Sequence, residues 1–371
     1  MNKLSAFGRA LGIVAVALIT LVSLTVLSGC YGGPFTPVPL VNSGPPNNPV
    51  FNPGQSTSQT STLGVAFNPQ TNLLYVLKKG DVASGYAGTV SVINQASNLV
   101  TATIPVGSWP AGVAVNPLTN TIYVTNYGGP SLSIINGATN VVTATIPNTS
   151  VGDTPLGVAV NPVTNKVYVT DFIGDLIYGI YVLDGKTGAL LAQIQTNGDV
   201  FSVAVNTLTN TIYATTQYSV LVINGDNNVV SATIAPPVSP QGIPTAFAAS
   251  GIVVDEAANI VYAGSTGSAT SGVSVINGAT NAITSTVALG STPSSLALDP
   301  IKHVVYATMD KPAVVGVIDT TKNTAGVSIP LVASPVAVAV NPATSMVYVT
   351  EGSELAVINP AGPTTTDIPI Q

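Results

Sequence analysis

One segment recurs along most of this chain, and the repetition constrains the fold more than any other feature of the sequence. The best-formed copy runs from Gly112 to Ile146. A tyrosine marks the same place in each copy, at intervals of 42 to 49 residues: Tyr75, Tyr123, Tyr168, Tyr213, Tyr262, Tyr306 and Tyr348. A period of this length suits a unit of four short strands better than a helical repeat.

The hydrophobic pattern inside the best copy separates four strands. Residues 112–115 are small and apolar, as expected for an inner strand that is buried on both sides. Residues 121–125 alternate between polar and apolar, and residues 132–135 and 141–146 continue as two further short strands. The pattern therefore predicts one four-stranded antiparallel unit in each copy.

Two turns within the copy have recognisable chemistry. Asn116 begins an Asn-Pro-Leu-Thr-Asn turn, in which its side chain is expected to bond the backbone two residues ahead. Asn136 and Gly137 predict a tight hairpin with positive φ angles between the third and fourth strands.

Seven such units account for residues 63–371. The composition agrees, because 46% hydrophobic and 6% charged residues, with 35 glycines and 28 prolines, are typical of a turn-rich all-β protein. We therefore predict a seven-bladed β-propeller of four-stranded antiparallel blades. The first copy has its own inner strand and the last copy its own outer strand, so we expect ring closure by apolar packing between blades one and seven.

One four-residue motif within the repeat is also found in a known family. Tyr123-Val124-Thr125-Asn126, together with Tyr168-Val169-Thr170-Asp171 and Tyr348-Val349-Thr350-Glu351, resembles the signature of the YVTN family of β-propeller repeats. The resemblance covers roughly residues 61–371 and implies the propeller fold, while it leaves the ligand open. Copies five and six depart most, at the turns that begin with Asp255 and Asp299.

Residues 1–29 are typical of a bacterial lipoprotein signal peptide. Two basic residues precede an apolar run over residues 10–26, and the Leu-Ser-Gly-Cys sequence that ends at Cys30 resembles a lipobox. The resemblance implies cleavage before Cys30 and lipidation of this single cysteine. The alternative is an uncleaved membrane anchor, for which about 17 apolar residues are at the short limit. We expect an extracytoplasmic protein that is lipid-anchored to a bacterial membrane, in the periplasm or at the cell surface.

Residues 30–62 form a predicted tether rich in Pro, Gly, Asn and Ser. Such a segment buries too little apolar surface to offset its ordering entropy. The alternative is that residues 56–62 pair with the last blade, although they lack the aliphatic alternation of a strand. After cleavage the chain holds seven lysines, no arginine and fifteen acidic residues, so we expect no nucleic acid partner.

The sequence offers no recognised reaction centre. His303 is the only histidine, and we interpret it as a turn residue on the rim opposite a propeller's working face. The sequence has no haem attachment motif, no glycine-rich phosphate loop and no serine nucleophile with a plausible base. We therefore expect no catalytic residue, no cofactor and no metal site. The alternative function is a propeller enzyme of lactonase-like or quinoprotein-like type.

The candidates for ligand binding are residues that break the repeat. By analogy with other propellers, the loops from the second to the third strand and the loops from one blade into the next gather around the mouth of the central channel. The aromatic candidates there are Trp109, Tyr127, Phe172 and Tyr218, and their acidic partners are Asp171 and Glu351. Loop aromatics suit a sugar ring or a peptide anchor, whereas the seven repeat tyrosines are expected to be core or inter-blade packing.

The alternative for any one of these aromatics is packing over the edge of its own blade. Taken together, the sequence favours a binding or interaction module for an unknown protein, peptide or glycan, anchored to the membrane through Cys30. A purely structural envelope protein is the remaining alternative.

Overall fold

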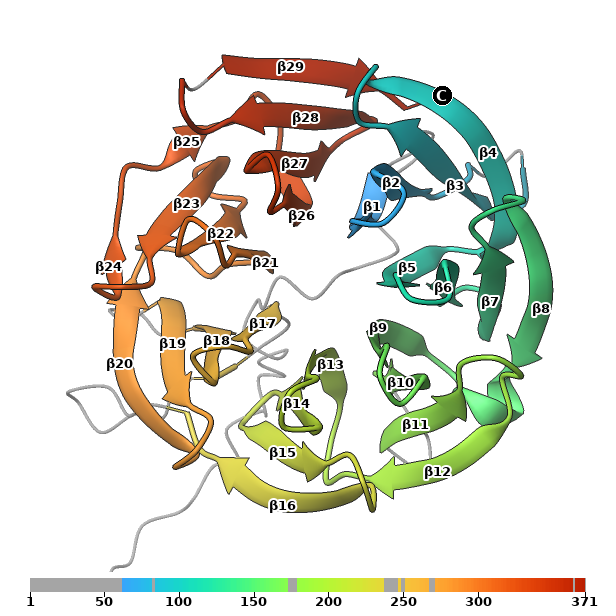
Figure 1. Ribbon diagram of the computed structural model, residues 1–371, viewed down its shortest axis with the longest axis horizontal. Coiled ribbons are helices and arrows are strands. Elements are labelled where there is room, and N and C mark those ends of the chain that lie inside the picture. The colour runs from blue at the N-terminus through green and yellow to red at the C-terminus, as the bar shows by residue number, and fades with distance from the viewer. Residues whose placement is uncertain are drawn as a thin grey trace, which may run out of the picture. The chain divides into compact units, whose positions relative to one another are not determined.

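The computed structural model of the chain describes residues 62–81, 84–172, 179–236, 246–247, 251–266, 271–362 and 364–370. The predicted signal peptide, Cys30 and the tether up to residue 61 lie outside the described residues. Seven antiparallel sheets form a ring around a central axis in the described part of the chain (Figure 1). This arrangement confirms the predicted all-β, seven-bladed propeller.

Each blade contributes one strand to each of four concentric positions. The inner strands surround the axis: β1 (Thr62–Asn68), β5 (Pro110–Asn116), β9 (Pro155–Asn161), β13 (Val200–Asn206), β17 (Ile252–Asp255), β21 (Ser295–Asp299) and β26 (Pro335–Asn341). The second strands carry the repeat tyrosines: β2 (Leu73–Lys78), β6 (Thr121–Asn126), β10 (Lys166–Asp171), β14 (Thr211–Thr216), β18 (Ile260–Ser265), β22 (Val304–Met309) and β27 (Met346–Glu351).

The third and fourth positions complete the blades. The third strands are β3 (Ala87–Asn94), β7 (Ser131–Asn136), β11 (Gly179–Asp184), β15 (Val220–Asn224), β19 (Gly272–Asn277), β23 (Val314–Asp319) and β28 (Glu354–Asn359). The outer strands are β4 (Leu99–Ser108), β8 (Val141–Pro147), β12 (Leu190–Gln195), β16 (Val229–Ile234), β20 (Ala282–Ala288) and β29 (Thr364–Pro369). In blade six the outer position is divided between β24 (Thr324–Ala325) and β25 (Ile329–Pro330), which both pair with β23.

Helical structure is almost absent from the described residues. It consists of a single 3-10 turn, η1 (Asn148–Ser150), between blades two and three. No helix in the described part of the chain is long and apolar enough to cross a membrane.

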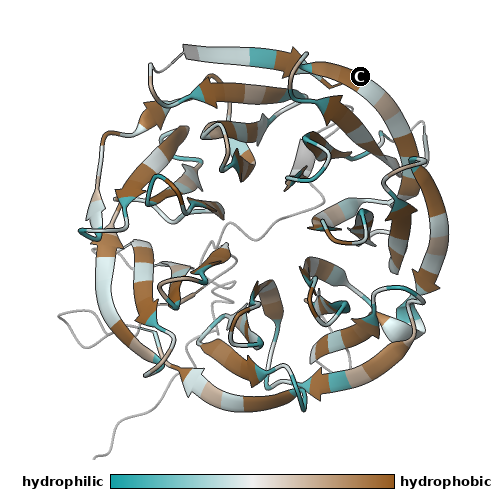
Figure 2. Ribbon diagram, viewed as in Figure 1, coloured by the Kyte–Doolittle hydropathy of each residue, from teal (hydrophilic) through white to brown (hydrophobic). Residues whose placement is uncertain are grey.

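The apolar core of the ring lies between blades. Each of seven buried clusters combines side chains from two neighbouring blades; for example, Tyr123 and Leu132 of blade two pack with Val167 and Leu183 of blade three. The repeat tyrosines are all buried, with at most 2% of any of them exposed. This burial confirms their predicted packing role. Figure 2 shows hydrophobic residues along the strands and hydrophilic residues in the turns that join them.

The ring closes without a blade that is shared between the two ends of the chain. The sheet β1-β2-β3-β4 contains only the first strands, and the sheet β26-β27-β28-β29 contains only the last ones. Leu74 and Ile93 of blade one pack with Tyr348 and Leu355 of blade seven, as the sequence predicted. The amino group of Lys78 adds a polar contact, donating to the carbonyl oxygen of Ile370 over 3.1 Å.

The turns between the first and second strands follow the predicted chemistry. The Asn116 Oδ1 atom accepts hydrogen bonds from the backbone N–H groups of Leu118 (3.0 Å) and Thr119 (3.3 Å). The last residue of the turn, Asn120, has a φ of 51°. His303 occupies this same position in blade six with a φ of 57°, which confirms that it is a turn residue.

The predicted tight hairpin at Asn136 and Gly137 is wrong. The structure has a four-residue turn over residues 137–140, and the positive φ falls on Asn140, at 55°. Gly137 is needed for space instead, because an added Cβ atom would lie 2.4 Å from the Oδ1 atom of Asn120. The turn glycine therefore marks a close approach of two turns rather than a left-handed backbone.

Asparagine side chains join the turns of five pairs of neighbouring blades among the described residues. The Nδ2 atom of the first asparagine in one blade donates to the Oδ1 atom of the last turn asparagine in the next blade. Four links measure 2.8 to 2.9 Å: Asn68 to Asn120, Asn116 to Asn165, Asn161 to Asn210, and Asn206 to Asn259. Asn341 completes the closing link to Asn72 over 3.3 Å.

Candidate functional site

The inner strands enclose a cavity of about 270 Å³ near the ends where they begin. Irregular pairing with the second strand places two consecutive residues of several inner strands at its wall. Examples of these pairs are Ala111 with Gly112, Leu156 with Gly157, and Val336 with Ala337. The second member of each pair is small because the inner strands crowd one another: a Cβ atom on Gly112 would lie 2.5 Å from the carbonyl oxygen of Leu156. The cavity is therefore the mouth of the axial channel.

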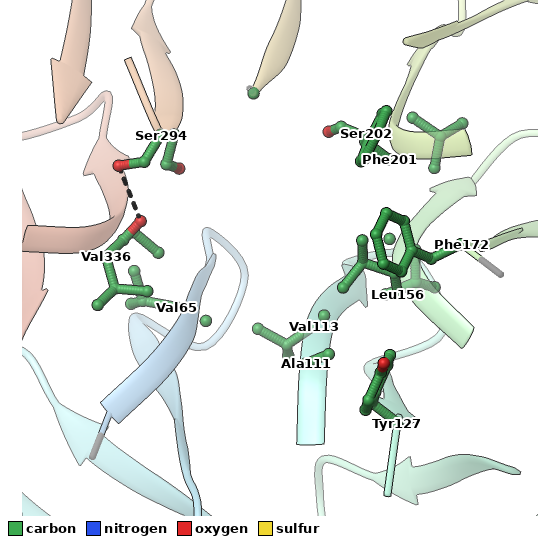
Figure 3. A pocket seen from close by; sticks show the side chains of 18 of the residues that line it. Val65, Ala111, Val113, Tyr127, Leu156, Phe172, Phe201, Ser202, Ser294 and Val336 are labelled. Atoms are coloured by element: carbon green, nitrogen blue, oxygen red, sulfur yellow. Dashed lines mark hydrogen bonds between the residues drawn. The ribbon is translucent and has the colours of Figure 1, made fainter. Parts of the chain in front are cut away.

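One side of the channel mouth is aromatic. Tyr127 follows β6, Phe172 follows β10, and Phe201 belongs to β13, so blades two, three and four each supply one ring. The rings of Phe172 and Phe201 lie 5.2 Å apart at an angle of 50°. Figure 3 shows these three rings on one side of the cavity, and Ser294 and Val336 on the other.

The residues that line the channel mouth carry no charge. None of them is Asp, Glu, Lys, Arg or His. Two of the serines already take part in bonds within the fold: the hydroxyl of Ser294 lies 2.8 Å from the hydroxyl of Thr308, and Ser295 Oγ accepts from the N–H of Val338 over 3.4 Å. The surface offered to a ligand is therefore mainly aromatic and aliphatic.

Trp109 lies behind this wall rather than within it. Its indole stacks on Tyr127 at 6.2 Å between ring centres, with 6° between the planes, and Tyr86 meets it edge-on at 5.2 Å. The ammonium group of Lys79 lies 4.2 Å from the centre of the indole, within cation–π distance. Trp109 does not line the cavity, and its contact with the cavity wall is the stack on Tyr127.

The backbone at Trp109 adopts a conformation that is rare for a bulky residue. Its φ is 49°, in the left-handed region. The N–H of Tyr127 donates to the carbonyl oxygen of Trp109 over 2.9 Å, and Gly128 leaves room for the indole, because a Cβ atom there would lie 2.9 Å from the Cγ atom of Trp109. Such strained conformations cluster at functional sites, which is consistent with a binding role for this loop.

The two predicted acidic partners hold loops instead of lining the cavity. Asp171 and Glu351 are each 2% exposed, and burial raises the pKa of both carboxyl groups above the ordinary values. Asp171 Oδ1 accepts bonds of 2.9 Å from the backbone N–H and the hydroxyl of Thr154. Glu351 Oε2 accepts from the N–H of Ala333 over 3.1 Å. In both cases the carboxylate fixes the segment that enters its own blade.

Tyr218 lies in a separate groove. It is 66% exposed and lines a cavity of about 550 Å³ beside the outer part of blade four, with no residue in common with the channel mouth. Of the four predicted aromatics, the structure therefore brings Tyr127 and Phe172 to the channel mouth, places Trp109 behind Tyr127, and sets Tyr218 apart.

Phe201 is a lining residue that the sequence reasoning missed. It occupies the place in the inner strand where Ala111, Leu156, Ser294 and Val336 stand in other blades. This position varies strongly between copies, so the criterion of departure from the repeat would have found Phe201 had it been applied to inner strands as well as to loops. In the part of the chain that the structure describes, no group of three or more His, Cys, Asp or Glu residues could hold a metal ion.

Comparison with known proteins supports the fold. No protein-family model and no curated protein matches the sequence. Among solved structures, hydrazine synthase from Kuenenia stuttgartiensis is similar, with a TM-score of 0.58 and 17% sequence identity over 86% of this chain and 99% of that chain. At this level of identity the likeness shows the propeller fold alone.

Proposed function

We propose that this protein is a lipid-anchored interaction module of the bacterial cell envelope, and that its channel mouth binds an apolar segment of a protein or peptide partner. The observation that carries the proposal is the wall formed by Tyr127, Phe172 and Phe201 around an uncharged cavity. Aromatic side chains supply large contact areas at low conformational cost and dominate binding energy at interfaces. The propeller fold is compatible with such a role.

The shape of the cavity favours a peptide over a sugar as its occupant. A volume of about 270 Å³ is slightly below the range of about 300 to 1,000 Å³ that is typical of small-molecule sites, so it suits one or two apolar side chains. Sugar hydroxyls need several polar partners, whereas Ser294 and Ser295 are already engaged within the fold, which leaves the hydroxyls of Ser202 and Tyr127. We therefore assign the channel mouth to an apolar or aromatic peptide anchor.

A peptide library displayed on phage and selected against the intact protein tests this assignment. We expect enriched peptides to share an aromatic or large aliphatic residue and to change the emission of Trp109, the only tryptophan, because it stacks on Tyr127. Tyr127→Ala and Phe172→Ala should each weaken binding of a labelled peptide at least about fivefold, as hot-spot residues do. Tyr218→Ala is the matched control and should leave the affinity unchanged.

Two results would contradict the proposal: a selection that enriches no peptide, or enriched peptides that bind the Tyr127→Ala and Phe172→Ala variants as tightly as the original protein. Circular dichroism of each variant would establish that the ring is intact. Alanine keeps the backbone N–H and C=O groups, and both residues lie outside the strands, so neither substitution alters the pairing of the sheets.

The membrane anchor is a separate part of the proposal. It rests on the lipobox resemblance at Cys30, which lies outside the described residues. Cys30→Ala should abolish labelling by a clickable fatty acid and block maturation in a bacterial host. If the variant still matures and takes up label, the lipoprotein assignment is wrong, while the assignment of the channel mouth is unaffected.

A further inference from the structure

We infer that the groove beside Tyr218 is a second binding site and that its ligand is a neutral oligosaccharide. The groove lies over blade four, between the segment that enters the blade and the loop that joins β14 to β15. It shares no lining residue with the channel mouth, so the inference is independent of the function proposed above.

The size and floor of the groove suit a ligand. A volume of about 550 Å³ falls within the range of about 300 to 1,000 Å³ that is typical of small-molecule sites. Leu221 and Val230 form an apolar floor, which continues into the core between blades three and four. The walls, in contrast, are polar and carry amide, hydroxyl and carboxylate groups from Gln195, Thr196, Asn197, Asp199 and Gln217.

Tyr218 offers an aromatic face on a well-fixed loop. Its side chain is 66% exposed, although the backbone around it is tightly bonded. The N–H of Thr216 donates to the carbonyl oxygen of Ser219 over 2.8 Å, and the N–H of Tyr218 donates to Thr216 Oγ1 over 3.3 Å. The N–H of Phe247 also donates to the carbonyl oxygen of Gln217 over 3.1 Å. An exposed ring on a rigid turn loses little entropy when a ligand stacks on it.

Asp199 supplies a hydrogen-bond acceptor in the same groove. It is partly buried, and among the described residues its carboxylate has no hydrogen-bond partner. A ligand hydroxyl would satisfy it. The apolar face of a pyranose ring stacks on an aromatic side chain, while its hydroxyls donate to carboxylates and exchange bonds with amides.

The charge of the groove selects among sugars. Asp199 is its only ionisable lining group apart from the tyrosine, and no Lys, Arg or His lines it. An anionic sugar would place like charges together without a cation to compensate, and burial of such a pair is costly. The groove therefore favours uncharged sugars over uronates, phosphosugars and sialylated glycans.

The intact protein titrated with cellohexaose, maltohexaose and hexa-N-acetylchitohexaose, with an oligogalacturonate as the anionic comparison, tests the inference. We expect at least one neutral oligosaccharide to bind and the oligogalacturonate not to bind. Tyr218→Ala should weaken binding about tenfold, whereas Tyr218→Phe, which keeps the ring, should retain it. Asp199→Asn should weaken binding severalfold. Leu208→Ala is the control, because Leu208 is 72% exposed but follows β13 at the opposite end of the blade.

Trp109 distinguishes the two sites. A sugar in the Tyr218 groove should leave the emission of Trp109 unchanged, since Trp109 contacts Tyr86, Lys79 and Tyr127 and belongs to the boundary of blades one and two. Absence of binding by all three neutral sugars at millimolar concentration would overturn the inference. A sugar that shifts the emission of Trp109, or that binds Tyr218→Ala and Asp199→Asn as well as the original protein, would overturn it too.

Discussion

Thr125 of blade two donates its hydroxyl hydrogen bond to the carbonyl oxygen of Leu156 in blade three, over 2.7 Å. The hydroxyl oxygen of Thr125 also accepts from the N–H of Gly112 over 2.8 Å, in the inner strand of its own blade, where pairing with the second strand is irregular. The third residue of the Tyr-Val-Thr motif therefore satisfies an inner-strand N–H and joins two neighbouring inner strands. Thr170 repeats the arrangement, accepting from Gly157 at 2.8 Å and donating to the carbonyl oxygen of Phe201 at 3.4 Å.

Thr125→Val is expected to destabilise the ring, because valine keeps the shape of the side chain but removes the partner of two part-buried backbone groups, the N–H of Gly112 and the carbonyl oxygen of Leu156. The expected loss in the free energy of unfolding is about 1–3 kcal/mol, measured by urea denaturation. Thr211→Val in blade four is the control, since among the described residues the hydroxyl of Thr211 makes exposed contacts with Thr209. Equal stability of the Thr125→Val variant and the original protein would contradict this role.

Two of the repeat tyrosines make a matched pair for a second prediction. Burial raises the pKa of Tyr123 to about 12, so its hydroxyl keeps its proton and donates to the carbonyl oxygen of Gly185 over 2.7 Å. The buried hydroxyl of Tyr168 has no partner among the described residues. Tyr123→Phe should therefore cost about 1 kcal/mol, and Tyr168→Phe should be neutral or stabilising. Thermal unfolding of the two variants measures this difference. A larger loss of Tm in Tyr168→Phe than in Tyr123→Phe would contradict the prediction.

The repeat made the fold predictable, while the binding site depended on features that the repeat does not encode. Seven tyrosines at one position, and turns that begin with asparagine, were sufficient for the blade count and the strand order. The hairpin at Gly137 was misjudged because a dipeptide does not show whether a glycine serves a left-handed backbone or a close contact. Here the contact is with Asn120, which belongs to a different turn, the one between the first and second strands.

The site could be predicted only in part because the direction of a side chain depends on bulges and loop lengths. Asp171 and Phe172 are adjacent in sequence, yet the first turns back to bond Thr154 and the second lines the channel mouth. Tyr218 was grouped with the other loop aromatics because it follows a second strand, but its tight turn at Thr216 to Ser219 directs it to another groove. Phe201 was overlooked because it lies within a strand.

A third prediction concerns the pH dependence of stability. Burial raises the pKa of Asp171 above its ordinary value of 3.8, so the folded protein holds this proton at pH values where the unfolded chain has released it. The contribution of protonated Asp171 to the stability of the fold is complete below the pKa of the unfolded chain. It is lost as the pH rises through the pKa of the folded protein. Asp171→Asn should therefore raise the Tm at pH 7 more than at about pH 3.5. Asparagine is tolerated at this place in blade two, as Asn126.

The opposite sign is expected for Asp184. Hydrogen bonds from Thr187 hold the pKa of this exposed carboxyl below its ordinary value, so its charge stabilises the fold above the unfolded pKa, and the effect is lost as the pH falls. Asp184→Asn should lower the Tm at pH 7 and have less effect in acid. If the change in Tm varied with pH in the same direction for the Asp171→Asn and Asp184→Asn variants, the opposite pKa shifts assigned to the two carboxyl groups would be wrong.

The last prediction concerns the seam where the ring closes. Gln95 stands where other copies have the turn glycines Gly137 and Gly225, and its side chain reaches blade seven. There its Nε2 atom donates to the hydroxyl of Tyr348, and its Oε1 atom accepts from Asn341. Gln95→Gly should lower the Tm by about 2–4 °C through loss of this link.

Deletion of residues 31–60 should leave the Tm almost unchanged, because blades one and seven each hold four strands of their own. A drop of about ten degrees or more on deletion would instead show that the segment before β1 supplies part of the closure.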